Sequence, residues 1–127
     1  MKIFIGGSFN NRVEVRKYMD KAIALGHVIT HDWTSVVTQP DSASRARTAK
    51  IDQEAVKDAD VAIFIMDDPN YPYRGTFTEL GMSIAYGKNI IIVNPLEKIA
   101  AMTNVYYHHP SIIHVKTWDD VVRELSV

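Results

Sequence analysis

The sequence has 127 residues, enough for one compact domain, and we expect a single domain over residues 1–127. Hydrophobic residues make up 46% of the chain and charged residues 23%, a composition typical of a folded globular protein. Lys and Arg together number 14 and Asp and Glu 15, so the net charge of -1 offers no polybasic surface for nucleic acid or an anionic membrane.

Cysteine is absent, which excludes disulfides and thiolate metal sites and fits a reducing compartment. The His residues at positions 27, 31, 108, 109 and 114 lack the spacing of a metal-binding motif, so we expect no metal ion. The first residues, MKIFI, are too few for a secretion signal, and no apolar run approaches the ~20 residues of a membrane span. We therefore expect a soluble, cytoplasmic protein.

The predicted elements follow in chain order. They are a strand over Lys2–Gly6, a helix over Asn11–Leu25, a strand over His27–Thr30, a surface loop over 34–44, a helix over Arg45–Lys57, a strand over Val61–Met66, a loop over Asp67–Gly75, a helix over Thr76–Tyr86, strands over Asn89–Val93 and Ile112–Val115, and a terminal helix carrying Trp118, Val121, Val122 and Leu125.

This alternation of strands and helices predicts a single Rossmann/flavodoxin-like α/β domain. We expect a mostly parallel, five-stranded sheet with helices on both faces. Ligands of such sheets bind beyond the carboxyl ends of the strands, where the strand order reverses. Three segments are therefore candidates for the site: Gly6–Arg12, His31–Trp33 and Asp67–Glu79.

The most informative motif is GTFTELG, at residues 75–81, which opens a helix directly after a strand and a loop. One interpretation is structural, because Thr76 and Glu79 have the spacing of a capping box that satisfies the first amides of a helix. The other is chemical. A carboxylate in the first helical turn is held ionised by the helix dipole and can act as a nucleophile at the edge of the sheet. Both interpretations use the same geometry.

The run GTFTELGMSIAYGKNIIIV, preceded by DADVAIFIMDD, resembles the nucleoside 2-deoxyribosyltransferase family, including the related deoxynucleotide N-hydrolases. The resemblance extends from KIFIGGS to TWDDVV. It implies that Glu79 is the nucleophile that takes the anomeric carbon of the sugar. It also implies that Asp52, eight residues before Asp60, contacts the base, and that Asn104 reaches into the site of a neighbouring subunit. A homodimer or higher homo-oligomer is therefore expected.

Two positions depart from the family pattern. Well-studied members carry a Tyr on the first strand that orients the nucleophile, and this chain has Phe4 there. The loss of that hydrogen bond costs ~1.5–3 kcal/mol if it is not replaced, and Tyr71, Tyr73 and Ser8 are the candidate replacements. Arg74 stands where some members have an Asp. The positive charge of Arg74 favours a phosphate or another anionic group on the substrate.

Further substrate-binding candidates lie in loops. The segment GGSFNNR offers Gly6, Ser8, Asn10 and Arg12 for a 5'-phosphate or 5'-hydroxyl, because small residues and a helix N-terminus favour anions. The alternative is a tight turn with a capping Asn, and the segment lacks the third glycine of a dinucleotide fingerprint. The remaining candidates, each also able to serve in the core or a turn, are Trp33 as a stacking platform, His31, Gly75 beside Arg74, and Tyr106 near Asn104.

We therefore predict an enzyme that cleaves the N-glycosidic bond of a nucleoside or nucleotide. Glu79 would form a glycosyl ester, with Asp52 anchoring or protonating the departing base, and the sugar would pass to another free base or to water. No cofactor is expected. Two alternatives remain: a non-catalytic nucleotide-binding sensor, consistent with Phe4, and a phosphoribohydrolase, although the PGG that precedes the similar motif there is missing.

Overall fold

The computed structural model describes residues 1–36 and 39–126. Its strands are β1 (Lys2–Gly7), β2 (Val28–Ile29), β3 (Val61–Ile65), β4 (Asn89–Val93) and β5 (Ile112–Val115). Its α-helices are α1 (Arg12–Ala24), α2 (Ser42–Asp58), α3 (Arg74–Ala85) and α4 (Trp118–Leu125). Short 3-10 helices span Phe9–Asn11, Trp33–Ser35, Ala100–Thr103 and Val105–His108.

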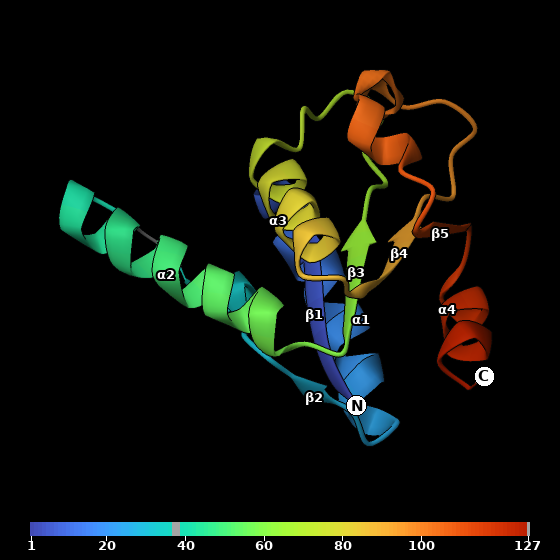
Figure 1. Cartoon of the computed structure of the whole chain (residues 1–127), viewed down its shortest axis with the longest axis horizontal. Coiled ribbons are helices and arrows are strands. Elements are labelled where there is room, and N and C mark those ends of the chain that lie inside the picture. The colour runs from blue at the N-terminus through green and yellow to red at the C-terminus, as the bar shows by residue number, and fades with distance from the viewer. Residues whose placement is uncertain (37–38, 127) are drawn as a thin grey trace.

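The five strands form one parallel sheet in the order β2-β1-β3-β4-β5. The α1 and α4 helices cover one face, and α2 and α3 cover the other (Figure 1). The predicted single α/β domain with a five-stranded sheet and helices on both faces is therefore confirmed. The chain moves outward to β2 on one side of β1 and to β3 on the other, so the strand order reverses between β1 and β3.

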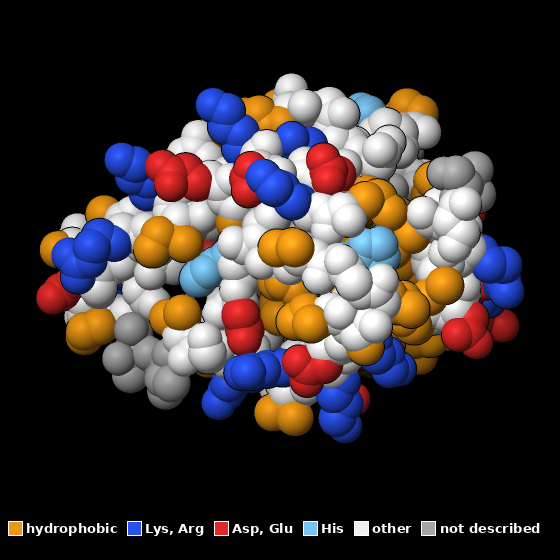
Figure 2. Space-filling model, turned by 90° about the horizontal axis from the view of Figure 1, so that it is seen from below, with side chains coloured by type: hydrophobic (Ala, Val, Ile, Leu, Met, Phe, Trp, Pro, Cys, Tyr) orange, Lys and Arg blue, Asp and Glu red, His pale blue; other side chains and the backbone are white. Residues whose placement is uncertain are grey.

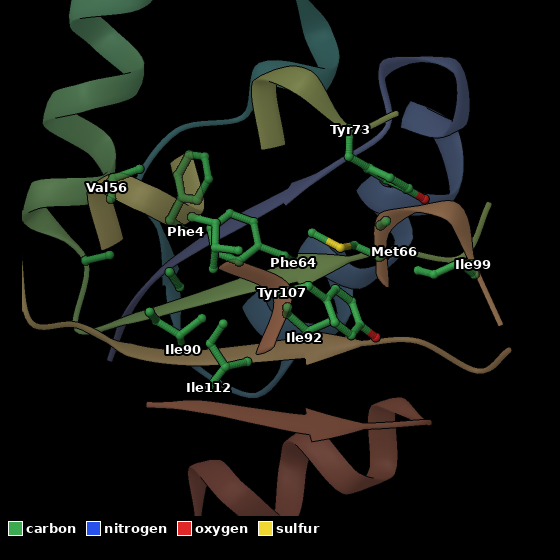
Figure 3. Close-up of a cluster of buried hydrophobic side chains, with 14 of the residues drawn as sticks. Phe4, Val56, Phe64, Met66, Tyr73, Ile90, Ile92, Ile99, Tyr107 and Ile112 are labelled. Carbon is green, nitrogen blue, oxygen red and sulfur yellow. The ribbon is translucent and has the colours of Figure 1, made fainter. Parts of the chain in front are cut away.

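The apolar runs of the sequence become strands that are covered on both faces, which is why they lack a polar face. Along β1, Ile3 and Ile5 pack under α1, while Phe4 packs under α2 and α3. Figure 3 shows the second of these clusters, where the rings of Phe4 and Phe64 lie with their centroids 6.2 Å apart. This cluster is the floor on which α2 and α3 rest.

Two helices begin earlier than predicted. The α2 helix begins at Ser42 instead of Arg45, because Asp41 and Ser44 form a capping box inside the stretch expected to be a loop. The predicted loop also contains residues 37 and 38, which lie outside the described residues. The α3 helix begins at Arg74 instead of Thr76, after Tyr73 takes a left-handed backbone conformation with φ of 54°. The predicted strand over 27–30 is reduced to Val28–Ile29.

Charges of both signs are mixed on the surface. On the face shown in Figure 2, Lys and Arg side chains lie among Asp and Glu side chains, in keeping with the net charge of -1. Across residues 1–36 and 39–126, no helix has both the length and the apolar character needed to cross a membrane.

Candidate active site

A cavity of about 560 Å³ lies between α2 and α3, at the carboxyl end of β1. Its described lining consists of Gly7, Phe9, Trp33, Val36, Gln39, Thr48, Ala49, Asp52, Gln53, Tyr71, Gly75, Thr76, Thr78, Glu79 and Met82. These residues come from the carboxyl ends of β1 and β2, the loop after β3 and the facing sides of both helices. The cavity therefore occupies the position where the strand order of the sheet reverses, as expected for a ligand site in such a sheet.

The carboxyl end of β1 is tied to the walls of the cavity by two hydrogen bonds. The indole Nε1–H of Trp33 donates to the carbonyl oxygen of Ile5 at 2.6 Å. The hydroxyl of Thr76 donates to the carbonyl oxygen of Gly7 at 3.1 Å. A Cβ at Gly7 would lie 2.8 Å from a methyl group of Val15, so only glycine lets α1 and β1 approach this closely. The backbone under the cavity is thus held rigidly.

The capping-box interpretation of Thr76 and Glu79 is wrong. The helix begins at Arg74, and the Thr76 hydroxyl bonds to β1 instead of to the amide of Glu79. Glu79 is the sixth residue of α3, which places it beyond the first turn and on the side that lines the cavity. The Glu79 side chain therefore does not serve in the capping box that the sequence pattern suggested.

The expectation that the helix dipole keeps Glu79 ionised is also wrong. Burial, and to a smaller extent the negative charge of Asp52, raises the pKa of the Glu79 carboxyl to about 8. The dipole acts strongly only within the first turn of a helix, whereas removal from water penalises a charge wherever the burial occurs. Near neutral pH the empty site therefore holds Glu79 largely in its protonated form.

Asp52 faces the same cavity from α2. Burial raises the pKa of its carboxyl, and the nearby His31 opposes that shift. The His31 Nε2 atom lies 3.9 Å from Asp52 Oδ1, and each of the two side chains is only 24% exposed. Asp52 Oδ1 is buried, and no donor in the described part of the chain hydrogen-bonds to it. Two carboxyls and an imidazole thus meet in one partly buried cluster.

Of the residues predicted for the site, Trp33, Asp52, Gly75 and Glu79 line this cavity together. They come from three separate elements, with Gly75 and Glu79 both on α3, and only the fold brings them to one place. Their chemical roles stay predictions.

In the predicted anion-binding segment GGSFNNR, the candidate residues are not part of the described cavity lining. Ser8 is buried and its hydroxyl accepts the amide N–H of Asn10, so it caps the short helix at Phe9–Asn11. Arg12 lies over the ring of Phe9, with its guanidinium carbon 4.6 Å from the ring centroid. Gly6 is buried, and no side chain fits there because a Cβ would lie 2.8 Å from the Phe64 ring. Phe9 reaches the cavity, whereas these four candidates are not among its described lining residues.

Three other candidates also lie outside the described cavity lining. Arg74 is exposed at the start of α3, next to the lining residue Gly75. Asn104 caps the helix Val105–His108, where its Oδ1 accepts the amide N–H of Tyr106 at 2.9 Å. The Tyr106 side chain is 57% exposed. The role of Asn104 and Tyr106 in a neighbouring chain's site stays a prediction.

Phe4 offers no hydroxyl at the position where other family members carry a Tyr. Its ring is fully buried and packs against Phe64. The Tyr73 hydroxyl accepts the amide N–H of Asp68 at 2.9 Å, and burial raises its pKa to about 12. Ser8 is engaged as a cap. Of the three candidate replacements for the missing Tyr, only Tyr71 lines the cavity.

Several lining residues were not predicted. On α2, Thr48 lies one helical turn before Asp52, and its hydroxyl donates to Gln39 Oε1 at 2.6 Å. On α3, Met82 lies nearly one turn after Glu79. The spacing of i and i+3 or i+4 around the two carboxyls was the available signal. Within the described residues, no group of three His, Asp or Glu side chains is arranged to hold a metal ion.

Together, the fold and the cavity define a Rossmann-like α/β protein with a small-molecule site at the reversal point of its sheet. The chain belongs to the nucleoside 2-deoxyribosyltransferase family, whose sequence profile matches residues 3–109. The resemblance predicted from the GTFTELG region is therefore confirmed.

Two solved structures are similar over nearly the whole chain. A 2-deoxyribosyltransferase from Bacillus psychrosaccharolyticus has 27% sequence identity and a TM-score of 0.76, with 95% of this chain and 90% of that chain covered. The CMP N-glycosidase BcmB from Clostridium botulinum has 18% identity and a TM-score of 0.63, with 99% and 98% covered, and shows the fold alone. No curated protein sequence gives a significant match.

Proposed function

We propose that this protein cleaves the N-glycosidic bond of a nucleoside or nucleotide through a covalent glycosyl ester on Glu79. The observation that carries the proposal is that Glu79 and Asp52 face one cavity from α3 and α2, at the reversal point of the sheet. Membership of the family and the deoxyribosyltransferase among the similar structures support this class of reaction.

In the proposed first step, a carboxylate oxygen of Glu79 forms a bond to the anomeric carbon of the sugar. The bond between that carbon and the base nitrogen breaks, and its electron pair stays on the base. Asp52 anchors the base or gives it the proton that it then needs. In the second step a new base or a water molecule attacks the same carbon and releases Glu79. Exclusion of water by the bound acceptor base favours transfer over hydrolysis.

The test is incubation with a panel of deoxynucleosides and their 5'-monophosphates, with and without a second free base, followed by chromatography. We expect release of the base or its exchange. Product formation that depends on the added base identifies a transferase, and formation without it identifies a hydrolase. Tight binding of an intact nucleotide with no turnover of any substrate would contradict the proposal and identify a binding module.

We further propose that two chains complete each other's sites. Asn104 and Tyr106 lie next to each other at the 3-10 helix Val105–His108, and neither is among the described residues lining its own chain's cavity. The family resemblance assigns the Asn104 position to the site of a neighbouring subunit, and the exposed ring of Tyr106 adds apolar surface beside it.

Mixing two inactive variants tests this arrangement. Asn104→Ala and Glu79→Gln are each expected to be inactive alone. After unfolding and refolding together as dimers, they should recover about a quarter of the wild-type activity, because half of the chains pair as heterodimers with one intact site. The measurement is turnover against the mixing ratio. Failure to recover any activity in a mixture shown to contain heterodimers would contradict shared sites.

A further inference from the structure

The buried oxygen of Asp52 is a hydrogen-bond acceptor without a donor in the described chain. The imidazole of His31 lies beside it, with its Nε2 atom 3.9 Å from Asp52 Oδ1. That distance permits attraction between charges but is too long for a hydrogen bond. His31 therefore interacts with Asp52 electrostatically, while the lone pairs of Oδ1 stay open to another donor. A buried acceptor of this kind is costly unless a ligand satisfies it.

His31 is held in place by its two neighbours in the chain. Asp32 forms an ion pair with Arg16 of α1 at 3.3 Å. The Trp33 indole donates to the carbonyl oxygen of Ile5 on β1 at 2.6 Å. Asp32 is thereby tied to α1 and Trp33 to β1, and His31, which directly precedes them after β2, lies beside Asp52 of α2. The contact between His31 and Asp52 is therefore part of the scaffold.

We propose that His31 is a positioning residue that keeps Asp52 an ionised acceptor, so that the site prefers bases that carry an exocyclic amino group. The inference rests on the proposed function, with Asp52 anchoring the base and not protonating it. A cytosine or adenine amino group offers an N–H to the open oxygen of Asp52. A uracil or hypoxanthine presents a carbonyl oxygen at the same ring position, which repels a carboxylate and leaves both acceptors unsatisfied.

The charges around Asp52 support this role. Glu79 faces it from α3 and His31 faces it from the end of β2, while Asp32 is paired with Arg16. Burial raises the pKa of the Asp52 carboxyl, and the charge of His31 lowers it. Loss of His31 therefore favours the protonated form of Asp52, which can donate a hydrogen bond and tolerates a carbonyl oxygen on the base.

The test compares kcat/KM within matched substrate pairs, deoxycytidine against deoxyuridine and deoxyadenosine against deoxyinosine. The wild-type enzyme should prefer the amino base by at least ~10-fold. His31→Leu should lower that preference by ~10-fold or more, and His31→Gln, which keeps a polar side chain without the charge, should lower it similarly. His27→Leu, at the other end of β2, serves as the control and should leave the preference unchanged. Ratios within one variant cancel any general loss of rate.

A double-mutant cycle separates action through Asp52 from a structural effect. In an Asp52→Asn background, His31→Leu should change the preference by less than ~2-fold. An equal change in both backgrounds would overturn the proposal, as would a wild-type preference near one. If no substrate turns over, the proposed function fails but the inference about His31 is still decided by carbon NMR. The titration midpoint of the Asp52 carboxyl should rise in His31→Leu, and an unchanged midpoint would refute the contact.

Discussion

Glu79→Gln is expected to lower the rate of glycosidic cleavage by at least about 10³-fold while the protein stays folded. The amide of Gln occupies nearly the same volume in the cavity but cannot form the glycosyl ester. No capping role is lost with it, because Thr76 bonds to Gly7 and the helix begins at Arg74. The measurement is single-turnover base release. A residual rate within ~10-fold of the wild type would rule out Glu79 as the nucleophile.

The pH dependence of kcat/KM in the wild-type enzyme tests whether the ionised carboxylate of Glu79 is required for the reaction. Because burial raises the pKa of Glu79 to about 8, the reactive carboxylate is lost as the pH falls through that value. We expect kcat/KM to fall about tenfold for each pH unit below the midpoint, the behaviour of a single required ionisation. A profile that stays flat between pH 6 and about 9 would contradict the raised pKa.

The stability of Glu79→Gln is the control for the raised pKa of Glu79. The sign of the stability difference between this variant and the wild type follows from proton binding. Between the ordinary pKa of 4.5 and about 8, the folded wild-type protein holds a proton on Glu79 that the unfolded chain has released. The wild-type stability therefore falls as the pH rises through this window. Glu79→Gln lacks this loss and should be more stable at pH 9 by ~2 kcal/mol, a value discounted for partial exposure to solvent. Urea unfolding of both proteins at pH 5 and pH 9 measures the difference.

Phe64→Ala is expected to destabilise the protein by ~3–5 kcal/mol. The ring is fully buried on β3, lies against Phe4 with a centroid separation of 6.2 Å, and fills the space over the Cα of Gly6 (Figure 3). Neighbouring side chains are themselves held by the sheet, so they cannot collapse far into the cavity that remains. Urea-induced unfolding followed by circular dichroism measures the loss.

Phe9→Ala is the matched control, because the Phe9 ring is 42% exposed and its removal should cost about 1 kcal/mol or less. A loss below about 1 kcal/mol for Phe64→Ala would show that the floor beneath α2 and α3 is not tightly packed. Activity should follow stability in Phe64→Ala, because that floor also supports the helices that carry Asp52 and Glu79.

The strands of this protein follow directly from the sequence. The predicted ranges Asn89–Val93 and Ile112–Val115 match β4 and β5, and the predicted Val61–Met66 exceeds β3 by one residue. Strands covered on both faces require unbroken apolar runs, and such runs are visible without any knowledge of the neighbours. The carboxyls Asp52 and Glu79 were also predicted, through a motif and its family resemblance.

The start of α3 and the ionisation of Glu79 were decided by tertiary structure. Tyr73 takes a positive φ because its ring is buried and its hydroxyl accepts the amide N–H of Asp68, neither of which a local pattern reveals. The Thr76 hydroxyl does not cap the helix because it donates a hydrogen bond to the carbonyl oxygen of Gly7, 69 residues away in the chain.

The sequence by itself determined the fold class, the order of the elements and the two carboxyls, because hydrophobic periodicity and short motifs are local properties. The tertiary structure decided how those carboxyls behave. Glu79 lies beyond the first turn of α3, so burial between α2 and α3 decides its pKa, and the end of β2 brings His31 to within 3.9 Å of Asp52. Solvation and charge pairing depend on distances between segments that are remote in the chain, and only the folded protein defines those distances.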